Sequence, residues 1–135
     1  MSTKQVIVMR KDLKMRRGKE IAQGSHASMA FLTRRFKGTY VENLHPLVDG
    51  RVSAKISPVE LEWLDSSFAK VTVQVNSEEE LLEIDKKARE AGLECHVVTD
   101  SGRTEFGGVP TKTCLAIGPD RSEKIDEITG HLPLY

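Results

Sequence analysis

Three polar side chains at helical spacing raise the first chemical question in this sequence. Residues 16–31 read RRGKEIAQGSHASMAF, and within them Lys19, Gln23 and His26 follow one another at intervals of four and three residues. On an α-helix such residues share one face, about one turn apart. An amine, an amide and an imidazole would then point the same way, and such groups can stabilise negative charge, hold a water and exchange a proton.

A nucleotide-type phosphate loop is excluded at the same place. Such a loop needs a glycine five residues before its Gly-Lys pair and a Ser or Thr directly after it. Around the pair Gly18-Lys19 these positions hold Leu13 and Glu20. The polar residues of this segment therefore serve another purpose.

A carboxylate stands at the end of a strand-like run. Asp100 closes the apolar segment LECHVVTD and precedes Ser101 and Gly102. In α/β sheets, ligand sites collect at the carboxyl ends of strands, which favours a functional role. Asp-Ser-Gly is also good turn chemistry, and on residue type alone a turn former is the simpler interpretation.

Charge is segregated along the chain although 20 Lys and Arg balance 20 Asp and Glu. Residues 1–37 hold ten basic and two acidic residues, a balance of +8, and the remainder carries −8. Half of these basic residues form a loop ahead of the polar helix: Arg10, Lys11, Lys14, Arg16 and Arg17. Such a surface attracts a polyanion, and a merely solvated face is the alternative.

Composition indicates a globular protein. With 135 residues, 39% hydrophobic and 30% charged, we expect one domain spanning 1–135. No apolar run approaches the roughly 18–20 residues of a membrane span, so we expect a cytoplasmic protein with no membrane partner. Cys95 and Cys114 lie in apolar runs without a second ligand pair at zinc spacing, which predicts buried packing thiols and no metal site.

Periodicity and capping signals give the elements that would position these residues. We predict strands at 4–9, 69–75, 93–100 and 113–118, and helices at 18–36, 57–64, 77–91 and 121–129. The stretch at about 37–68 is expected to be an irregular insert apart from its short helix. This order predicts an α/β fold with three layers, α/β/α, around a small mixed four-stranded sheet with one antiparallel strand.

The helix at 18–36 also has a predicted packing face. At 100° per residue, Ile21, Met29, Leu32 and Phe36 fall within about 80° of one another. That stripe would pack on the sheet, and the side with Lys19 would be exposed.

Four segments, taken in order, resemble the peptidyl-tRNA hydrolase type II family of archaea and eukaryotes. They read VIVMRKDLKMRRGKEIAQGSHA, VVTDSGRT, TKTCLAIGP and IDEITGHLPLY, and the resemblance covers nearly the whole chain except about 37–68. It implies hydrolysis of the ester that joins a peptide to the 3′ end of tRNA, which recycles tRNA from stalled translation. It also implies an enzyme without metal or other cofactor, with peptidyl-tRNA as its partner, and often a homodimer.

The resemblance also implies the site. The catalytic positions fall here on Lys19, His26, Asp100 and Thr104, and the substrate-binding positions on Gln23, Ser25, Arg103 and Thr113. The basic loop would contact tRNA phosphates.

Ester hydrolysis needs an attacking oxygen, an acceptor for its proton and donors at the carbonyl oxygen. We expect Asp100 to orient or deprotonate a water and Lys19 to stabilise the oxyanion or a terminal phosphate, so these two groups must converge in one pocket. Thr104 and Gln23 would position water and substrate. His26 is either a base or a structural partner of the loop that carries Asp100.

One departure from the family pattern leaves alternatives open. After GRT the family usually reads like QIAPGT, whereas this chain has EFGGVPT with one extra residue. A noncatalytic tRNA- or protein-binding domain of the same fold is therefore the alternative function. A thiol hydrolase using Cys95 or Cys114 with His96 would require an exposed thiol of low pKa.

Overall fold

The computed structural model describes residues 2–36 and 52–135, and the first part of the predicted insert, 37–51, lies outside them. In chain order the elements are β1 (Thr3–Arg10), α1 (Arg17–Phe36), α2 (Pro58–Asp65), β2 (Lys70–Val75), α3 (Glu78–Glu90), β3 (Cys95–Asp100), β4 (Thr111–Arg121) and α4 (Ser122–Thr129). Every predicted strand and helix is present. No helix among these residues is long and apolar enough to cross a membrane.

The four strands form one mixed sheet in the order β2-β1-β4-β3. β1 pairs parallel with β2, and β4 runs antiparallel to both β1 and β3, so the prediction of one antiparallel strand is confirmed. In this register Asp100 lies opposite Thr111, and Met9 lies opposite Cys114. The end of β3, the start of β4 and the end of β1 therefore meet at one end of the sheet.

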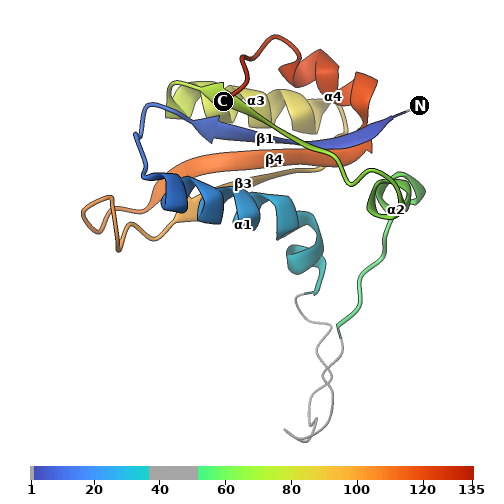
Figure 1. Ribbon diagram of the computed structural model, residues 1–135, viewed down its shortest axis with the longest axis horizontal. Helices are drawn as coiled ribbons and strands as arrows, with labels where there is room; N and C mark the ends of the chain where they lie inside the picture. Colours follow the sequence, from blue (N-terminus) through green and yellow to red (C-terminus); the bar gives the residue numbers. More distant parts are fainter. Residues whose placement is uncertain (1, 37–51) are drawn as a thin grey trace, which may run out of the picture.

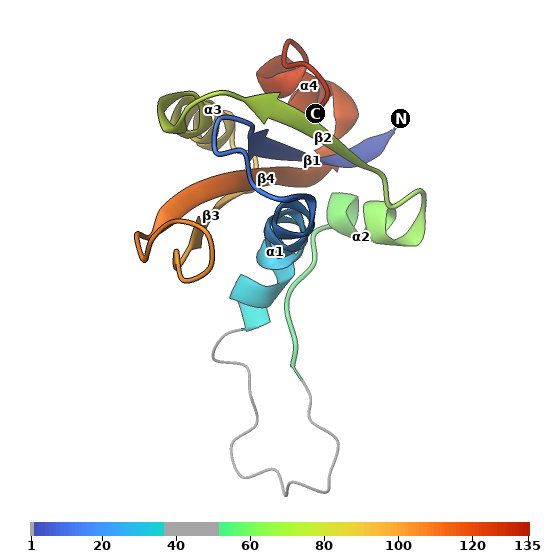
Figure 2. The same ribbon diagram turned by 60° about the vertical axis from the view of Figure 1, so that its left-hand side comes forward.

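Helices cover the sheet on both faces, as Figures 1 and 2 show, with α3 and α4 on one side and α1 and α2 on the other. Successive side chains of β1 alternate between the two layers. Val6 and Val8 pack with residues of α3 and α4, whereas Ile7 and Met9 belong to a second cluster beneath α1. This arrangement is the predicted three-layer fold.

The packing face of α1 differs from the predicted one. Its buried residues are Gln23, Gly24, Ala27, Ala30 and Phe31. Ile21 and Met29, which were predicted to pack, are 63% and 58% exposed. Small residues let the helix lie close to the sheet: a Cβ at Gly24 would be 3.7 Å from the Met9 Cε. The predicted stripe is wrong for these two residues. The prediction assumed that the longest apolar side chains face the sheet, whereas small residues allow the helix to pack more closely against it.

The end of β4 also extends beyond its predicted limit at 118. The strand continues through a buried Pro119 to Arg121, where it pairs with Thr3 of β1. The β1–β4 register shifts between Lys4 and Val6, beside this proline. A proline, which lacks a donor, is tolerated in a strand where the regular ladder is interrupted.

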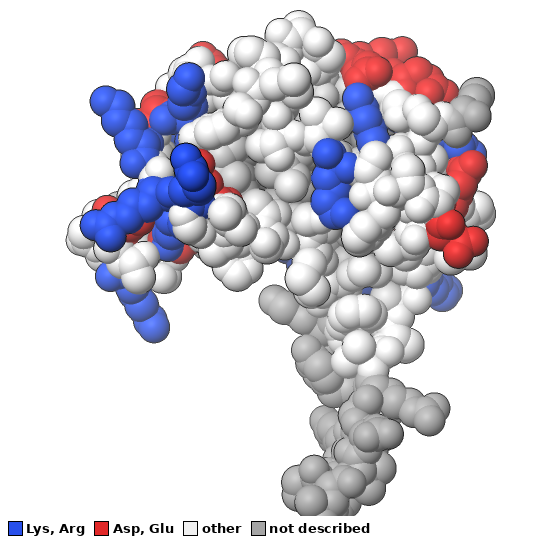
Figure 3. All heavy atoms as spheres, in the orientation of Figure 1, with Lys and Arg blue, Asp and Glu red and all other residues white. Residues whose placement is uncertain are grey.

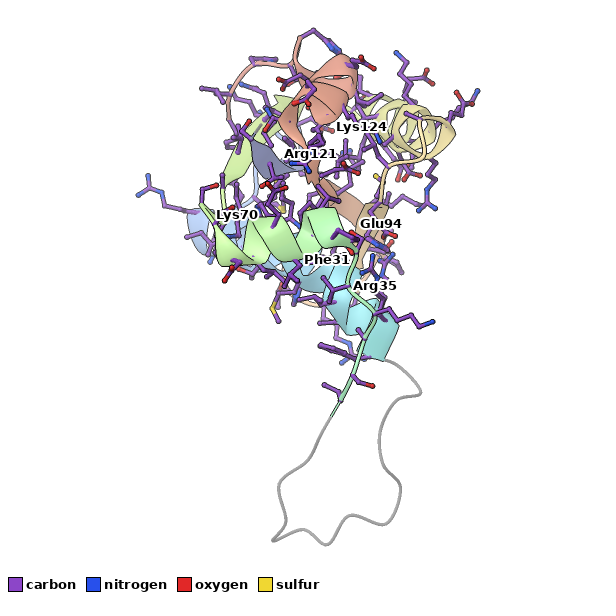
Figure 4. All side chains as sticks on the ribbon, turned by 90° about the vertical axis from the view of Figure 1, so that its right-hand side faces the viewer. Phe31, Arg35, Lys70, Glu94, Arg121 and Lys124 are labelled. Carbon is purple, nitrogen blue, oxygen red and sulfur yellow. The ribbon has the colours of Figure 1, made fainter. Side chains whose placement is uncertain are left out.

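A buried ion pair attaches α2 to the C-terminal end of α1. Ser57 caps α2 in a capping box with Glu60, as its sequence predicts. The Glu60 carboxylate is 2% exposed and accepts two hydrogen bonds from Arg35, at 2.8 and 2.7 Å. Arg35 also lies 3.2 Å from Glu94, and Figure 4 labels Arg35 and Glu94 together with Phe31 beside α2. The pair fixes the direction in which the chain returns to β2.

This pair yields a stability prediction. Burial acts to raise the pKa of Glu60, but hydrogen bonds from Arg35 and Ser57 outweigh it, and the pKa lies below its ordinary value. The stability contributed by the pair is therefore present above the unfolded-state pKa and is lost as pH falls through the folded-state pKa. Arg35→Met leaves a buried carboxylate unpaired and should lower the free energy of unfolding by about 3 kcal/mol at neutral pH.

Urea unfolding at pH 7 and at about pH 3 measures this effect, since protonated Glu60 no longer needs a cation. Lys87→Met is the control, because Lys87 and Glu83 are both half exposed and 3.9 Å apart. That substitution should cost less than about 0.5 kcal/mol. An Arg35→Met cost that is the same at both pH values would contradict the assignment.

Candidate active site

A lysine and an aspartate 81 positions apart meet at the end of the sheet where β3 stops and α1 begins. The Lys19 Nζ donates to Asp100 Oδ1 at 2.8 Å and to Thr104 Oγ1 at 2.9 Å. Gln23 Nε2 donates to the same Asp100 oxygen at 3.2 Å. The structure thus brings four of the predicted site residues into one hydrogen-bonded cluster.

The loop after β3 holds the other carboxylate oxygen. Gly102 N donates to Asp100 Oδ2 at 2.8 Å, which is the turn interaction that Asp-Ser-Gly predicts. Gly102 has φ +81°, and a Cβ there would lie 2.2 Å from the Val109 carbonyl oxygen. Only glycine fits this position. Asp100 therefore forms the turn through one carboxylate oxygen and contacts Lys19 and Gln23 through the other.

Electrostatics keep Asp100 ionised. The hydrogen bond from Lys19 is the main cause that lowers the pKa of Asp100; desolvation opposes it, and the bonds from Gly102 and Gln23 add to it. The two side chains are 15% and 10% exposed, so the pair is sheltered yet still reachable from solvent. A carboxylate with a lowered pKa accepts a water's hydrogen bond readily but is a weak base.

A buried threonine lies beneath the cluster. Thr113 Oγ1 donates to Gln23 Oε1 at 2.5 Å, and the two residues are 0% and 2% exposed. This bond turns the Gln23 amide so that its NH₂ group faces Asp100. Thr113 was predicted to bind substrate. Because it is buried, its side chain contacts Gln23 and can act on a substrate only through that residue.

The other predicted residues of the site stand apart from the cluster. Ser25 Oγ donates to the Ile21 carbonyl within its own helix, at 2.8 Å. His26 and Arg103 are exposed, and neither side chain makes a hydrogen bond within residues 2–36 and 52–135. His26 lies seven residues from Lys19, a displacement of about 10 Å along the helix, which explains why a shared face does not bring the two side chains together.

Basic residues surround this end of the molecule, where Figure 3 shows Lys and Arg side chains gathered around the β1–α1 and β3–β4 connections. Lys11, Lys14, Arg16 and Arg17 are exposed. Arg10 differs from the other predicted phosphate ligands: it bonds to both Asp12 oxygens and to the Lys112 carbonyl, and its side chain is 11% exposed. Arg10 therefore braces the loop.

One aromatic residue of the rim had no sequence prediction. The Phe106 ring lies 5.8 Å from Lys19 Nζ and packs against the apolar cluster beneath α1. It belongs to the segment EFGGVPT, where the chain departs from the family pattern. An aromatic residue directly before Gly107 and Gly108, two residues after the GRT segment, was the signal that could have identified it.

The cysteines do not offer a nucleophile. Both are buried, and burial raises the pKa of the Cys114 thiol to about 11 and that of Cys95 further above its ordinary value. His96 is engaged with Arg34 and Glu94. A thiolate is therefore disfavoured at neutral pH. Within the described ranges, no three His, Cys, Asp or Glu side chains gather as metal ligands.

Comparisons with known proteins agree with the resemblance. A family model described as Peptidyl-tRNA hydrolase PTH2 matches residues 3–135. The peptidyl-tRNA hydrolase of Methanocaldococcus jannaschii is 44% identical over 132 residues, covering 97% of this chain and 98% of that protein. That of Methanothermobacter thermautotrophicus is 45% identical over 131 residues, with 97% and 98% covered.

A solved structure of a protein of unknown function from Agrobacterium tumefaciens is also similar, with a TM-score of 0.55. It covers 100% of this chain and 98% of its own, at 14% identity. This similarity shows a shared fold.

The Lys19–Asp100 contact predicts a measurable titration change. Lys19→Met should raise the pKa of Asp100, because its largest stabilising contact is lost. The stability that this carboxylate supplies would then be lost at a higher pH during acidification. Carboxyl ¹³C NMR follows the titration. Lys11→Met is the control, because Lys11 is an exposed lysine of the loop before α1. An unchanged Asp100 pKa would contradict the pairing.

Proposed function

The chain belongs to the peptidyl-tRNA hydrolase PTH2 family and hydrolyses the ester bond between a peptide and tRNA, and we propose that Lys19 and Asp100 are its central catalytic pair. This reaction recycles tRNA from stalled translation. One observation supports the assignment above all others: the 2.8 Å contact that joins an amine and a carboxylate at the end of the sheet, beside the basic loop.

Asp100 orients the attacking water. Its Oδ1 accepts from Lys19 and Gln23 and its Oδ2 from Gly102, so the carboxylate is held in one position. Because its pKa is lowered, Asp100 takes the water's proton only as the oxygen bonds to the ester carbon. The proton then passes to the ribose 3′ oxygen as the ester C–O bond breaks, which leaves a free peptide acid and tRNA.

Lys19 supplies positive charge at the carbonyl oxygen. Two of its three ammonium hydrogens point to Asp100 and Thr104. The third has no acceptor among residues 2–36 and 52–135 and can donate to the oxyanion that forms during attack. Thr104 is exposed and holds the amine from the side of the β3–β4 loop. Gln23 lies on the buried side of the cluster, where its amide donates a hydrogen bond that holds Asp100 in position.

The exposed loop cations bind the tRNA. Lys11, Lys14, Arg16 and Arg17 lie beside the first turn of α1, and the Arg16 side chain is 91% exposed. Phosphates near the 3′ end of tRNA would contact these residues when the ester reaches Asp100. We leave Arg10 out of this group because its guanidinium already donates to the Asp12 carboxylate and the Lys112 carbonyl.

The noncatalytic alternative is not favoured. Relatives of 44% and 45% identity over nearly the whole chain are named peptidyl-tRNA hydrolases. The altered segment 105–110 changes the rim, where Phe106 lies, while Asp100 keeps contacts from Lys19, Gln23 and Gly102. A change of substrate preference follows from this more directly than a loss of turnover.

The oligomeric state, the domain organisation and the location of the enzyme also belong to the proposal. The resemblance supports a homodimer and one domain spanning 1–135, with its insert at about 37–68. The place of the substrate in translation supports a cytoplasmic location.

Asp100→Asn tests the proposed water-orienting group. We expect kcat for peptidyl-tRNA hydrolysis to fall at least about 100-fold with little change in KM, because an amide cannot take up the proton. Asp85→Asn is the control, since Asp85 pairs with Arg89 at the same 2.8 Å on α3. A wild-type kcat in Asp100→Asn would exclude Asp100 from catalysis.

Replacing Arg16 and Arg17 together by alanine tests the tRNA contacts. KM should rise while kcat stays nearly intact. The slope of the logarithm of the binding constant against the logarithm of the salt concentration should become less steep by about 0.7 to 0.9 for each phosphate contact that is lost. The matched control replaces Lys86 and Lys87, two neighbouring exposed cations on α3. Loss of kcat with unchanged KM would assign the two arginines to the chemical step instead.

A further inference from the structure

An aromatic ring borders the catalytic cluster on the side of the β3–β4 loop. The centre of the Phe106 ring lies 5.8 Å from Lys19 Nζ, within the distance at which an aromatic face attracts an ammonium. Phe106 packs against the apolar cluster beneath α1, as Leu13 of the basic loop does, and part of its surface stays exposed. An apolar side chain is thus fixed beside the ion pair while remaining accessible to a substrate.

The loop holds this ring in position. The Phe106 carbonyl accepts a hydrogen bond from Val109 N at 3.0 Å, and Gly108 N donates to the Gly102 carbonyl at 2.8 Å. Gly107 and Gly108 have φ values of +58° and +80°, so the chain turns directly after the aromatic residue. A ring that is already fixed loses little conformational entropy when a flat ligand packs on it.

Phe106 lies between two parts of the site that bind neighbouring groups of the substrate. On one side is Lys19, whose ammonium serves the ester carbonyl in the proposed mechanism. On the other side, the carboxylate of the preceding residue, Glu105, lies 3.9 Å from Nε of Arg16, one of the exposed loop cations. In Figure 1 the β1–α1 and β3–β4 connections project from the same end of the sheet. The aromatic residue therefore stands between the reacting bond and the cations that bind phosphate.

The covalent structure of tRNA decides which part of the substrate reaches this place. The ester joins the peptide to the ribose of the terminal adenosine, and the nearest phosphate is attached to the 5′ oxygen of the same ribose. One nucleoside therefore separates the bond at Asp100 from the first phosphate at the loop cations, whereas the peptide leaves the ester in the other direction. Bases at single-stranded RNA ends are bound by stacking on aromatic side chains.

We propose that Phe106 binds the terminal base of the tRNA by stacking and thereby directs the ester to Lys19 and Asp100. The inference rests on the proposed function. Stacking needs a flat ring and makes no contact with the peptide, which suits an enzyme whose substrates share a terminal nucleoside and differ in their peptides. It also gives a role to the segment EFGGVPT, in which the chain departs from the family pattern.

Removing the base from the substrate separates stacking from every other role of the ring. The two substrates are tRNAs that carry the same N-acetyl-leucine, one with its terminal adenosine and one with an abasic ribose at that position. Phe106→Leu keeps an apolar side chain on the cluster and loses the aromatic face. We expect this variant to raise KM about tenfold on the adenosine substrate with kcat nearly unchanged, and to match the wild-type enzyme on the abasic substrate.

Two further variants serve as controls. Phe106→Tyr retains the ring and should keep the wild-type KM on both substrates. Phe68→Leu makes the matched substitution at an aromatic residue that is 49% exposed and lies outside the catalytic cluster, and it should leave both substrates unaffected. Phe106→Met repeats the test should Phe106→Leu melt below the assay temperature.

An equal loss on both substrates would overturn the proposal and assign the ring to holding Lys19 or the loop. A loss that disappears when glycine replaces leucine in the acyl group would also overturn it, because the ring would then bind the peptide. If the wild-type enzyme hydrolysed the adenosine substrate and Phe106→Leu did so with the same KM, the inference alone would fail. If the wild-type protein hydrolysed neither substrate, the proposed function would fail first, and the inference with it.

Discussion

The ion pair between Lys19 and Asp100 is the interaction on which the rest of this structure depends. Both groups are largely withdrawn from water, and a sheltered ion pair persists only when further hydrogen bonds compensate its desolvation. Thr104, Gln23 and the Gly102 amide supply those bonds. The sheet register makes this possible, because it brings the end of β3 and the start of β4 to the first turn of α1.

The close packing of α1 serves the same pair from below. Gly24, Ala27 and Ala30 hold the helix near the sheet, so Gln23 sits within reach of both Thr113 and Asp100. A longer side chain at those positions would lift the helix and separate the amide from its partners. The same close fit exposes Ile21 and Met29 and leaves room for a groove beside β2.

Much of this could be predicted from the sequence, for identifiable reasons. Strands and helices followed from periodicity and caps. The place of Asp100 at a strand end suggested either a turn former or a site residue, and the family resemblance favoured the site. The buried face of α1 could not be predicted, because it depends on how closely two layers approach rather than on hydrophobicity. Helical spacing placed His26 on the face of Lys19, yet a side chain two turns away does not reach the same partner. The burial of Thr113 and the engagement of Arg10 depend on contacts between distant segments.

The loop between β3 and β4 is closed on itself. Gly108 N donates to the Gly102 carbonyl at 2.8 Å and Val109 N to that of Phe106 at 3.0 Å, so its ends are tied next to Asp100 while its tip projects outward. Between these tied ends, Thr104 and Phe106 contact Lys19 and the apolar cluster beneath α1, so we expect the remaining loop residues to tolerate substitution without moving the carboxylate. We expect that this loop can be exchanged for the corresponding loop of a relative, and that such an exchange would change which substrates the enzyme prefers.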